Sequence, residues 1–144
     1  MDIGGVYLVN FPYKGGREFY GRHYAVVISK ISKDDQTLLV APITGKKANK
    51  RYRGGITIVN TKYQENPKYE NSFIYARKIQ EIDKRKIIYK RKKQVDEHGN
   101  TLLDSTGKEL FKKIYAKAYQ LDNEDFNSLR NVCKEVIKFN WEDK

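Results

Sequence analysis

Residues 24–43, YAVVISKISKDDQTLLVAPI, hold the pattern that decides the fold. Two short apolar runs, residues 24–29 and residues 37–43, flank a polar turn at residues 33–36. Short runs rich in β-branched and aromatic side chains predict β-strands. The first run is apolar throughout, which predicts a strand buried on both faces.

Further strands are predicted on either side of this stretch. They lie at residues 6–11, 56–59, 72–79 and 114–119. Two Asp-x-x-Gly units, residues 96–99 and 104–107, predict the tips of hairpins. A helix is predicted over residues 123–138, because apolar side chains recur there at the spacing of one helical face, with Asp122 as its N-cap.

The order of these elements, many short strands and then one helix, predicts an α+β fold that is mainly β. We expect a small, strongly bent antiparallel sheet or partly open barrel, covered by the C-terminal helix. At 144 residues, the chain is expected to form a single domain over residues 1–144.

Charge indicates the kind of partner. The chain has 29 Lys and Arg against 18 Asp and Glu, and residues 84–93, KRKIIYKRKK, contain no acid at all. Clustered cations favour a polyanion partner through counterion release. An anionic membrane is the rival, but no long apolar helix face supports it. The single cysteine, Cys133, excludes a disulfide within the chain and fits a cytoplasmic location.

The residue types also restrict the chemistry. Two histidines and one cysteine cannot form a zinc site without several carboxylates, and no nucleotide-binding loop is visible. An enzyme of this composition is expected to need no metal and no cofactor. RNA fits such an enzyme, because its own 2′-hydroxyl attacks the phosphate and the protein supplies only a base, a cation and an acid.

Suitable groups lie at the ends of predicted strands, where a sheet presents functional side chains. They are Arg22, His23, Thr44 and Ser72. The loop that follows Thr44, residues 45–55, carries five bases around one tyrosine, which favours contact with RNA.

Four segments in order resemble the MazF/PemK-type toxins. They are residues 6–12 (VYLVNFP), 21–29 (GRHYAVVIS), 40–44 (VAPIT) and 72–84 (SFIYARKIQEIDK). The resemblance implies an SH3-like barrel, usually dimeric, in a small cytosolic toxin restrained by an antitoxin. It also implies cleavage of single-stranded RNA without metal, leaving a 2′,3′-cyclic phosphate and a 5′-hydroxyl.

The resemblance also assigns residues. Thr44 matches the family's active-site threonine, whereas the family's arginine falls on His23, with Arg22 one place earlier. Either Arg22 or His23 is therefore expected in the catalytic centre, with Lys46 and Ser72 near the scissile phosphate. The basic residues expected to hold RNA are Lys47, Lys50, Arg51, Arg53, Arg77, Lys78, Lys84, Arg85, Lys90, Arg91 and Lys92.

Residues 88–113 form an extra basic segment that resembles nothing in the compact toxins. The Ala-Pro-Ile-Thr strand end and its lysine-bearing loop are also similar to the RNA-inhibited ToxN/CptN (type III) branch. The antitoxin is thus expected to be RNA or a small acidic protein, with RNA preferred. The assembly is expected to be a homodimer or a closed protein–RNA complex.

Two alternatives remain open. One is an RNA-binding SH3-like module without catalysis. The other is a gyrase-poisoning toxin of the CcdB kind, which uses a Trp-Gly-Ile ending, whereas residues 141–144 here read WEDK.

Overall fold

The computed structural model of the chain describes residues 1–16, 20–30, 34 and 36–136. No helix among these residues is long and apolar enough to cross a membrane. In chain order, the elements are β1 (Gly5–Phe11), β2 (Gly21–Ser29), β3 (Thr37–Gly45), β4 (Gly55–Val59), η1 (Asn60–Lys62), β5 (Asn71–Tyr75), η2 (Ala76–Lys78), β6 (Gln80–Asp83), η3 (Lys84–Lys86), β7 (Tyr89–Lys93), β8 (Phe111–Tyr115), β9 (Tyr119–Gln120) and α1 (Asn123–Val136), where η marks a 3₁₀ turn.

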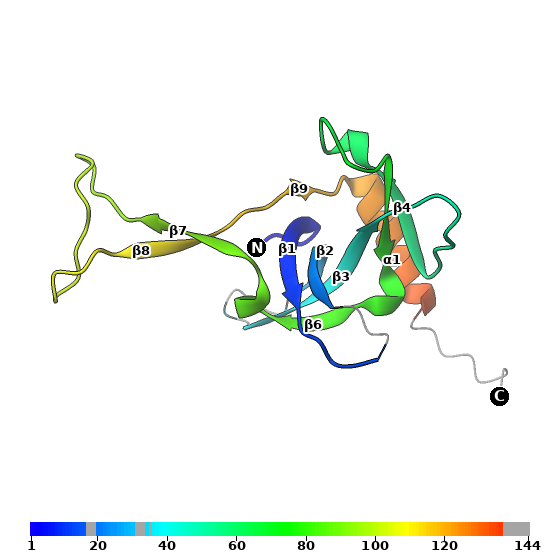
Figure 1. Cartoon of the computed structure of the whole chain (residues 1–144), viewed down its shortest axis with the longest axis horizontal. Coiled ribbons are helices and arrows are strands. Elements are labelled where there is room, and N and C mark those ends of the chain that lie inside the picture. The colour runs from blue at the N-terminus through cyan, green and yellow to red at the C-terminus, as the bar shows by residue number, and fades with distance from the viewer. Residues whose placement is uncertain (17–19, 31–33, 35, 137–144) are drawn as a thin grey trace.

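The main sheet bends around β3. One edge of β3 pairs with β2, while its other edge pairs first with β6 and then with β5. The strand order is β4-β5-β3-β2-β1-β9, with β6 also on β3, and the pairs are antiparallel. Figure 1 shows the resulting curled sheet with α1 beside it. The predicted fold class, a strongly bent antiparallel sheet with a C-terminal helix, is confirmed.

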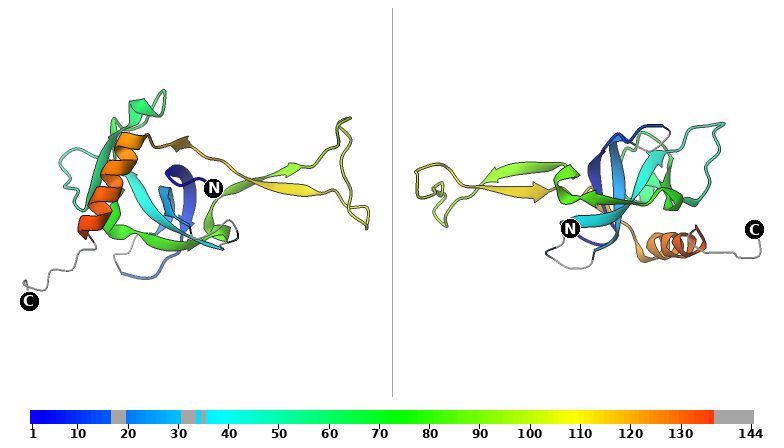
Figure 2. Two further views of the ribbon diagram at one scale, coloured as in Figure 1. Left: turned by 180° about the vertical axis from the view of Figure 1, so that it is seen from behind. Right: turned by 90° about the horizontal axis from the view of Figure 1, so that it is seen from below.

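Both faces of the central strands are covered. One cluster, which includes Val26 and Ala41, packs with Leu129 of α1, the helix that lies against one side of the sheet in Figure 2. A second cluster on the other face includes Val27 and Ile87. Neighbouring residues of a strand thus enter different clusters, as the two-residue repeat of a strand requires.

The expectation of double burial holds only for the middle of β2. Residues 25–27 are buried, but Tyr24 is 48% exposed, so the prediction was wrong at that residue. The reason lies in the pairing, because β2 pairs with β3 only from Ala25 onward. The preceding residues of β2 have β1 on one side and no β3 partner on the other.

The helix begins where it was predicted to begin. The Asp122 carboxylate accepts a hydrogen bond from the backbone N–H of Asp125 at 2.8 Å, which is an N-cap. Lys62 of η1 lies 2.6 Å from the same carboxylate, and this partner together with the cap lowers the pKa of Asp122. The helix is confirmed as far as Val136, and residues 137–138 lie outside the described residues.

Two predicted strands are each divided in two. Residues 72–79 form β5 and β6 with the turn η2 between them, because the two halves pair with different ends of the bent strand β3. Residues 114–119 fall into β8 and β9, since β8 pairs with β7 whereas β9 pairs with β1. Both predictions of a single strand were therefore wrong.

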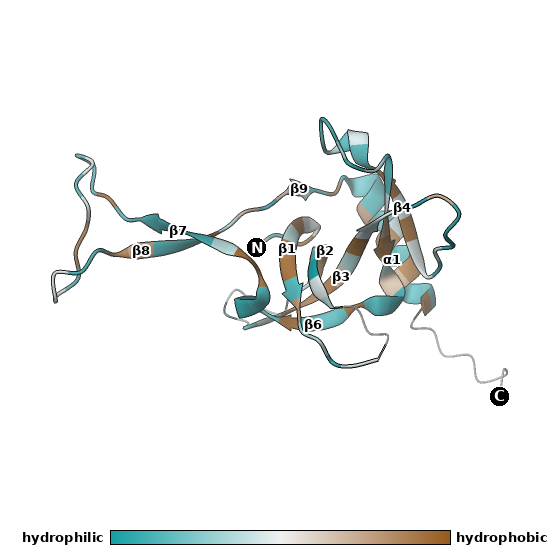
Figure 3. Ribbon diagram, in the orientation of Figure 1, coloured by the Kyte–Doolittle hydropathy of each residue, from teal (hydrophilic) through white to brown (hydrophobic). Residues whose placement is uncertain are grey.

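β7 and β8 form a separate two-stranded ribbon that projects from the body (Figure 1). We call residues 89–115 the arm. Its two ends are anchored on β1, because Ile87 bridges to Val9 and the N–H of Ala118 donates to the carbonyl of Val6. Figure 3 shows mostly hydrophilic residues along the ribbon, whereas the strands of the body mix hydrophobic with hydrophilic residues.

The far end of the arm is forked. Gln94, Leu102 and Leu110 join their backbones in a triangle of hydrogen bonds of 2.9–3.0 Å, and one tight turn extends from each side of this junction. The carboxylates of Asp96 and Asp104 accept hydrogen bonds from the N–H groups of these turns. The two predicted hairpin tips are confirmed.

Candidate active site

Thr44 stands in a row of three side chains on one face of the sheet. Thr44 on β3 lies directly opposite Phe73 on β5, and Phe73 lies directly opposite Thr57 on β4. Directly paired residues project to the same face. Within the described part of the chain, the Thr44 hydroxyl makes no hydrogen bond. We call this side of β3, β5 and β4 the Thr44 face.

Lys46 belongs to the same face. Its backbone N–H still donates to the carbonyl of Asn71 at 2.9 Å, so the chain remains extended two residues past Thr44. The Lys46 ammonium donates to the Thr57 hydroxyl at 3.1 Å. A cation is thereby held over the same row that contains the unbonded hydroxyl of Thr44.

An aromatic layer lies beside this row. Phe73 and Tyr75 are 4% and 6% exposed, with ring centroids 5.0 Å apart. Tyr52 lies over them, 5.4 Å from the Phe73 ring. Ammonium groups surround the layer, with Lys46 and Lys50 at 5.6 and 5.5 Å from the Tyr52 ring. A half-buried aromatic ring between cations is the arrangement that binds the base and phosphate of a single-stranded nucleic acid.

The loop that carries these cations is tied down by the same tyrosine. The Tyr52 hydroxyl accepts a hydrogen bond from the N–H of Lys47 at 2.9 Å and donates to the carbonyl of Gly45 at 3.4 Å. The turn between them includes Asn49 at a φ of 63°, a conformation that asparagine tolerates better than most residues. The loop therefore holds Tyr52 in place over the aromatic layer.

Arg77 and Lys78 extend the positive charge past Tyr75. The Lys78 ammonium lies 4.4 Å from the centroid of the Tyr75 ring, and the Arg77 guanidinium lies 5.5 Å from it. Burial, reinforced by the charges of Arg77 and Lys50, lowers the pKa of Lys78. An anion bound here would be attracted by all three cations.

His23, rather than Arg22, shares the orientation of Thr44. Ala25 is paired with Pro42, and by the two-residue repeat His23 projects to the Ala25 side just as Thr44 projects to the Pro42 side. Arg22 projects to the opposite side of β2 and is exposed. Of the two candidates for one position, the strand geometry therefore directs His23 to the Thr44 face.

The protonation of His23 follows from its contacts. Its Nε2 lies 2.9 Å from the carbonyl oxygen of Tyr20, and a carbonyl only accepts, so Nε2 carries the hydrogen. Nδ1 is then the basic nitrogen. Burial lowers the pKa of His23, and the Tyr20 hydrogen bond offsets part of that effect. The imidazole is accordingly neutral at pH 7.

Ser72 is not brought to the Thr44 face. It lies directly opposite Gly45 and Ile58, on the side of the sheet that packs against α1, and is 8% exposed. Its hydroxyl accepts a hydrogen bond from the buried side chain of Asn60 at 2.8 Å. Ser72 is thus held within the protein by a structural contact.

The other predicted RNA-binding residues separate into two regions. Lys47, Lys50, Arg51 and Arg53 are exposed on the loop after Thr44, and the carbonyl of Arg53 accepts a hydrogen bond from the Arg77 guanidinium. The second region holds the residues of η3 and the arm, which Figure 1 shows on the side away from that loop: Lys84, Arg85, Lys90, Arg91 and Lys92.

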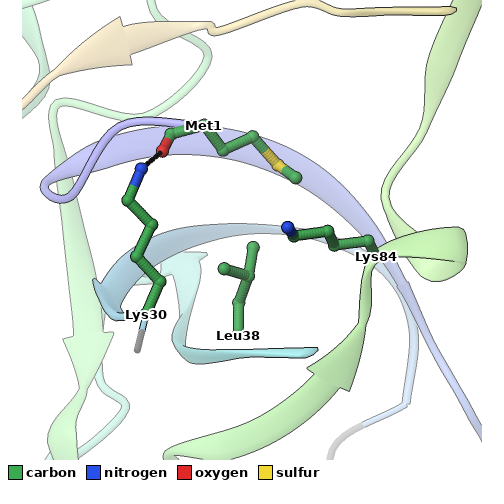
Figure 4. A pocket seen from close by; sticks show the side chains of 4 residues that line it. All are labelled: Met1, Lys30, Leu38 and Lys84. Carbon is green, nitrogen blue, oxygen red and sulfur yellow. Dashed lines mark hydrogen bonds between the residues drawn. The ribbon is translucent and has the colours of Figure 1, made fainter. Parts of the chain in front are cut away.

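Lys84 lines a hollow of about 220 Å³ near the beginning of β3, with Met1, Lys30 and Leu38. Figure 4 shows the ammonium of Lys30 hydrogen-bonded to the carbonyl of Met1, at 2.6 Å. Leu38 and Thr44 are six residues apart on β3, or roughly 20 Å along an extended strand. The hollow is therefore separate from the Thr44 face.

A family match agrees with the order of these elements. The family described as PemK-like, MazF-like toxin of type II toxin–antitoxin system matches residues 2–111, more than half of the chain. The chain belongs to this family. The resemblance to MazF/PemK-type toxins is thus confirmed, and no protein of curated function matches the chain.

Membership in the PemK/MazF family makes this protein a toxin of a toxin–antitoxin system, and the members are endoribonucleases. An antitoxin partner and an RNA substrate follow in general terms from that membership. The match ends at residue 111, the first residue of β8, so it extends through most of the arm.

Sequence reasoning missed three residues of this toxin's candidate site. Phe73, Tyr75 and Thr57 flank Thr44 and Lys46 only because β5 and β4 pair with the end of β3. Alternation within residues 72–79 does place Phe73 and Tyr75 on one face, but the register against β3 is needed to relate that face to Thr44. No three His, Cys, Asp or Glu gather as a metal site in the described ranges.

Proposed function

We propose that this toxin cleaves single-stranded RNA without a metal ion, at a centre formed by Thr44, His23 and Lys46. The observation that carries the proposal is the unbonded hydroxyl of Thr44 on a face that also receives Lys46 and, by strand alternation, His23. Nδ1 of His23 removes the proton of the 2′-hydroxyl, whose oxygen attacks the adjacent phosphorus.

Thr44 and Lys46 act on the scissile phosphate and its leaving group. The Thr44 hydroxyl donates a hydrogen bond to a non-bridging oxygen, and the Lys46 ammonium stabilises the charge that develops there. The 5′-oxygen leaves with a proton from Lys46. The products are a 2′,3′-cyclic phosphate and a 5′-hydroxyl, so one proton is taken up by His23 and one is released by Lys46.

The loop after Thr44 supplies binding rather than chemistry. Bases of the substrate stack on Tyr52, while phosphates lie against Lys47, Lys50, Arg51, Arg53, Arg77 and Lys78. Support comes from the ring of Tyr52, which is half-buried on Phe73 and flanked by Lys46 and Lys50.

The direct test is cleavage of a long single-stranded RNA in EDTA, with analysis of the ends. We expect cutting with cyclic phosphate and 5′-hydroxyl ends. Thr44→Ala should lower kcat by about 10- to 100-fold, the effect of one hydrogen bond to a charged oxygen. Thr44→Ser keeps the hydroxyl and is the matched variant. Binding without cleavage would identify an RNA-binding module, and full activity of Thr44→Ala would overturn the role of Thr44.

Replacing Tyr52 separates binding from chemistry. Tyr52→Ala should weaken binding of a non-cleavable 2′-O-methyl strand by about 10- to 100-fold, because one stacked base contributes about 1–3 kcal/mol. Tyr52→Phe retains the ring but loses the hydroxyl that joins Lys47 to Gly45, so a smaller loss is expected. Fluorescence anisotropy measures both. Wild-type affinity in Tyr52→Ala would mean that no base stacks there.

The antitoxin and the assembly are proposed more broadly. The family description names type II systems, and the basic surface suits either an acidic protein or an RNA antitoxin. Co-purification of the toxin with its neighbouring genes, followed by separate RNase and protease treatment, identifies which of the two restrains cleavage. Light scattering on the same complex distinguishes a homodimer from a closed protein–RNA assembly.

A further inference from the structure

The arm presents bases on both of its faces. On one face, Arg91, Lys93 and Lys113 alternate with aromatic rings; on the other, Lys90, Lys92 and Lys112 surround Ile114. All six of these basic side chains are exposed. The one described ion pair on this stem joins Lys93 to Glu109, which leaves five stem cations without an acidic partner among the described residues.

The cations of the arm do not stabilise the fold of the arm. Arg91 lies directly opposite Lys113, and Lys92 lies directly opposite Lys112. Like charges at directly paired positions destabilise a ribbon, and a free two-stranded ribbon is marginal even without them. These cations are therefore better explained by an anionic partner than by the folding of the arm.

Aromatic rings hold two of the cations in place. The Arg91 guanidinium lies 4.5 Å from the Phe111 ring centroid, and the Lys113 ammonium lies 4.7 Å from that of Tyr89. Such contacts fix long side chains upright on the ribbon and reduce the entropy lost on binding. The arm's charged surface is accordingly ordered before any partner arrives.

The shape of the arm narrows the choice of partner. Charges on both faces are satisfied together only by a ligand that presents anions on two walls. The groove of a duplex does so, whereas an acidic peptide or flat surface covers one face. The major groove of B-form DNA, about 12 Å wide, admits a two-stranded β-ribbon. The major groove of A-form RNA is too narrow for one.

We propose that the arm binds double-stranded DNA by inserting β7 and β8 into the major groove. The five-residue stem is roughly 16 Å long, enough to follow the groove over several base pairs. Lys90, Lys92 and Lys112 contact the phosphates of one wall, and Arg91 and Lys113 those of the other. This activity is separate from RNA cleavage, because the arm projects away from the loop after Thr44 (Figures 1 and 2).

The test is equilibrium binding of the full chain to a 20-base-pair DNA duplex of mixed sequence at several salt concentrations. A variant with Lys90→Gln, Lys92→Gln and Lys112→Gln should bind about 100-fold more weakly at 0.1 M salt, and the slope of log affinity against log salt should fall by about three. Its melting temperature should equal or exceed that of the wild type, because the change relieves like-charge pairing.

The matched control removes three exposed bases elsewhere, with Lys14→Gln, Arg130→Gln and Lys134→Gln. It should keep the DNA affinity of the wild type. Equal losses in both variants would show diffuse attraction and overturn the proposal. Equal affinity for an RNA duplex of the same sequence would overturn the groove assignment. Displacement of DNA by polyglutamate of equal charge would indicate an acidic protein as the partner instead.

Discussion

His23→Ala should lower kcat for RNA cleavage by about 10²- to 10⁴-fold, the range that a positioned general base contributes. The chain offers two histidines, of which only His23 projects to the side of the sheet that carries Thr44. Its Nε2 hydrogen is donated to the carbonyl of Tyr20, so Nδ1 is the nitrogen without a hydrogen and is the proposed acceptor of the 2′-hydroxyl proton.

The pH dependence of kcat/KM also tests the role of His23 as a base. Burial disfavours the charged imidazolium and lowers the pKa of His23 from its ordinary value of about 6.5. The base is active when neutral, so kcat/KM should be level near pH 7 and fall as the pH drops through that lowered pKa. The acidic limb should therefore lie below pH 6.5 in the wild type and be missing in His23→Ala.

Two further variants test whether His23 is the general base. His98→Ala removes the other histidine, which lies in an exposed turn of the arm, and should keep both the rate and the acidic limb. His23→Arg restores the residue type of the family pattern; it should stabilise charge but show no titration in this range. An acidic limb that persists in His23→Ala would place the base on another residue.

The comparison between Arg22 and His23 tests the same geometry. Both residues precede the apolar part of β2, and sequence alone left the choice between them open. Because adjacent residues of a strand project to opposite faces, only one of them can approach Thr44. The loss of kcat in His23→Ala should therefore exceed that in Arg22→Ala by tenfold or more.

The sequence predicted the local elements well because their signals are local. The turns at residues 96–99 and 104–107 depend on Asp and Gly at fixed positions, and the start of α1 depends on Asp122 and the side chains that follow it. Short runs of apolar, β-branched and aromatic side chains likewise located β1, β2, β3 and β4. Each of these features is decided within about ten residues of chain.

The features that the sequence did not predict depend on pairing between residues that are distant in the sequence. Residues 72–79 are uniformly strand-like, and the break at Ala76 arises only because β3 bends and offers β5 and β6 separate stretches of its edge. Ser72 stands at the start of a predicted strand, where functional side chains often lie, but the pairing of β5 places it on the other side of the sheet from Thr44. Its hydroxyl accepts a hydrogen bond from Asn60, twelve residues earlier, and no sequence pattern relates the two residues.

Lys46→Ala should lower kcat by at least about 10²- to 10³-fold, because it removes both a donor that stabilises charge in the transition state and the group that protonates the leaving 5′-oxygen. Lys46 is the first cation after Thr44. Because its N–H still pairs with β5, its side chain projects from the Thr44 face. Lys46→Arg keeps the charge but cannot release a proton to the leaving oxygen, and should recover only part of the rate.

The comparison that decides the role of Lys46 is Lys47→Ala. Lys47 is exposed and one residue further along the same loop, on a chain segment tied to Tyr52. If Lys46 acts on the transition state and Lys47 on the bound phosphates, Lys46→Ala loses kcat at saturating RNA, whereas the loss in Lys47→Ala falls on KM and diminishes at low salt. Single-turnover kinetics measure both.

Thr57→Val tests whether Thr57 positions Lys46. The change removes the hydroxyl to which the Lys46 ammonium donates at 3.1 Å and keeps the volume of the side chain. Thr57 is then a positioning residue, and its loss should lower kcat less than Lys46→Ala does. In the background of Lys46→Ala, Thr57→Val should have no further effect on kcat, since the group that it positions is gone. Additive losses in the double variant would mean that Thr57 contacts RNA independently of Lys46.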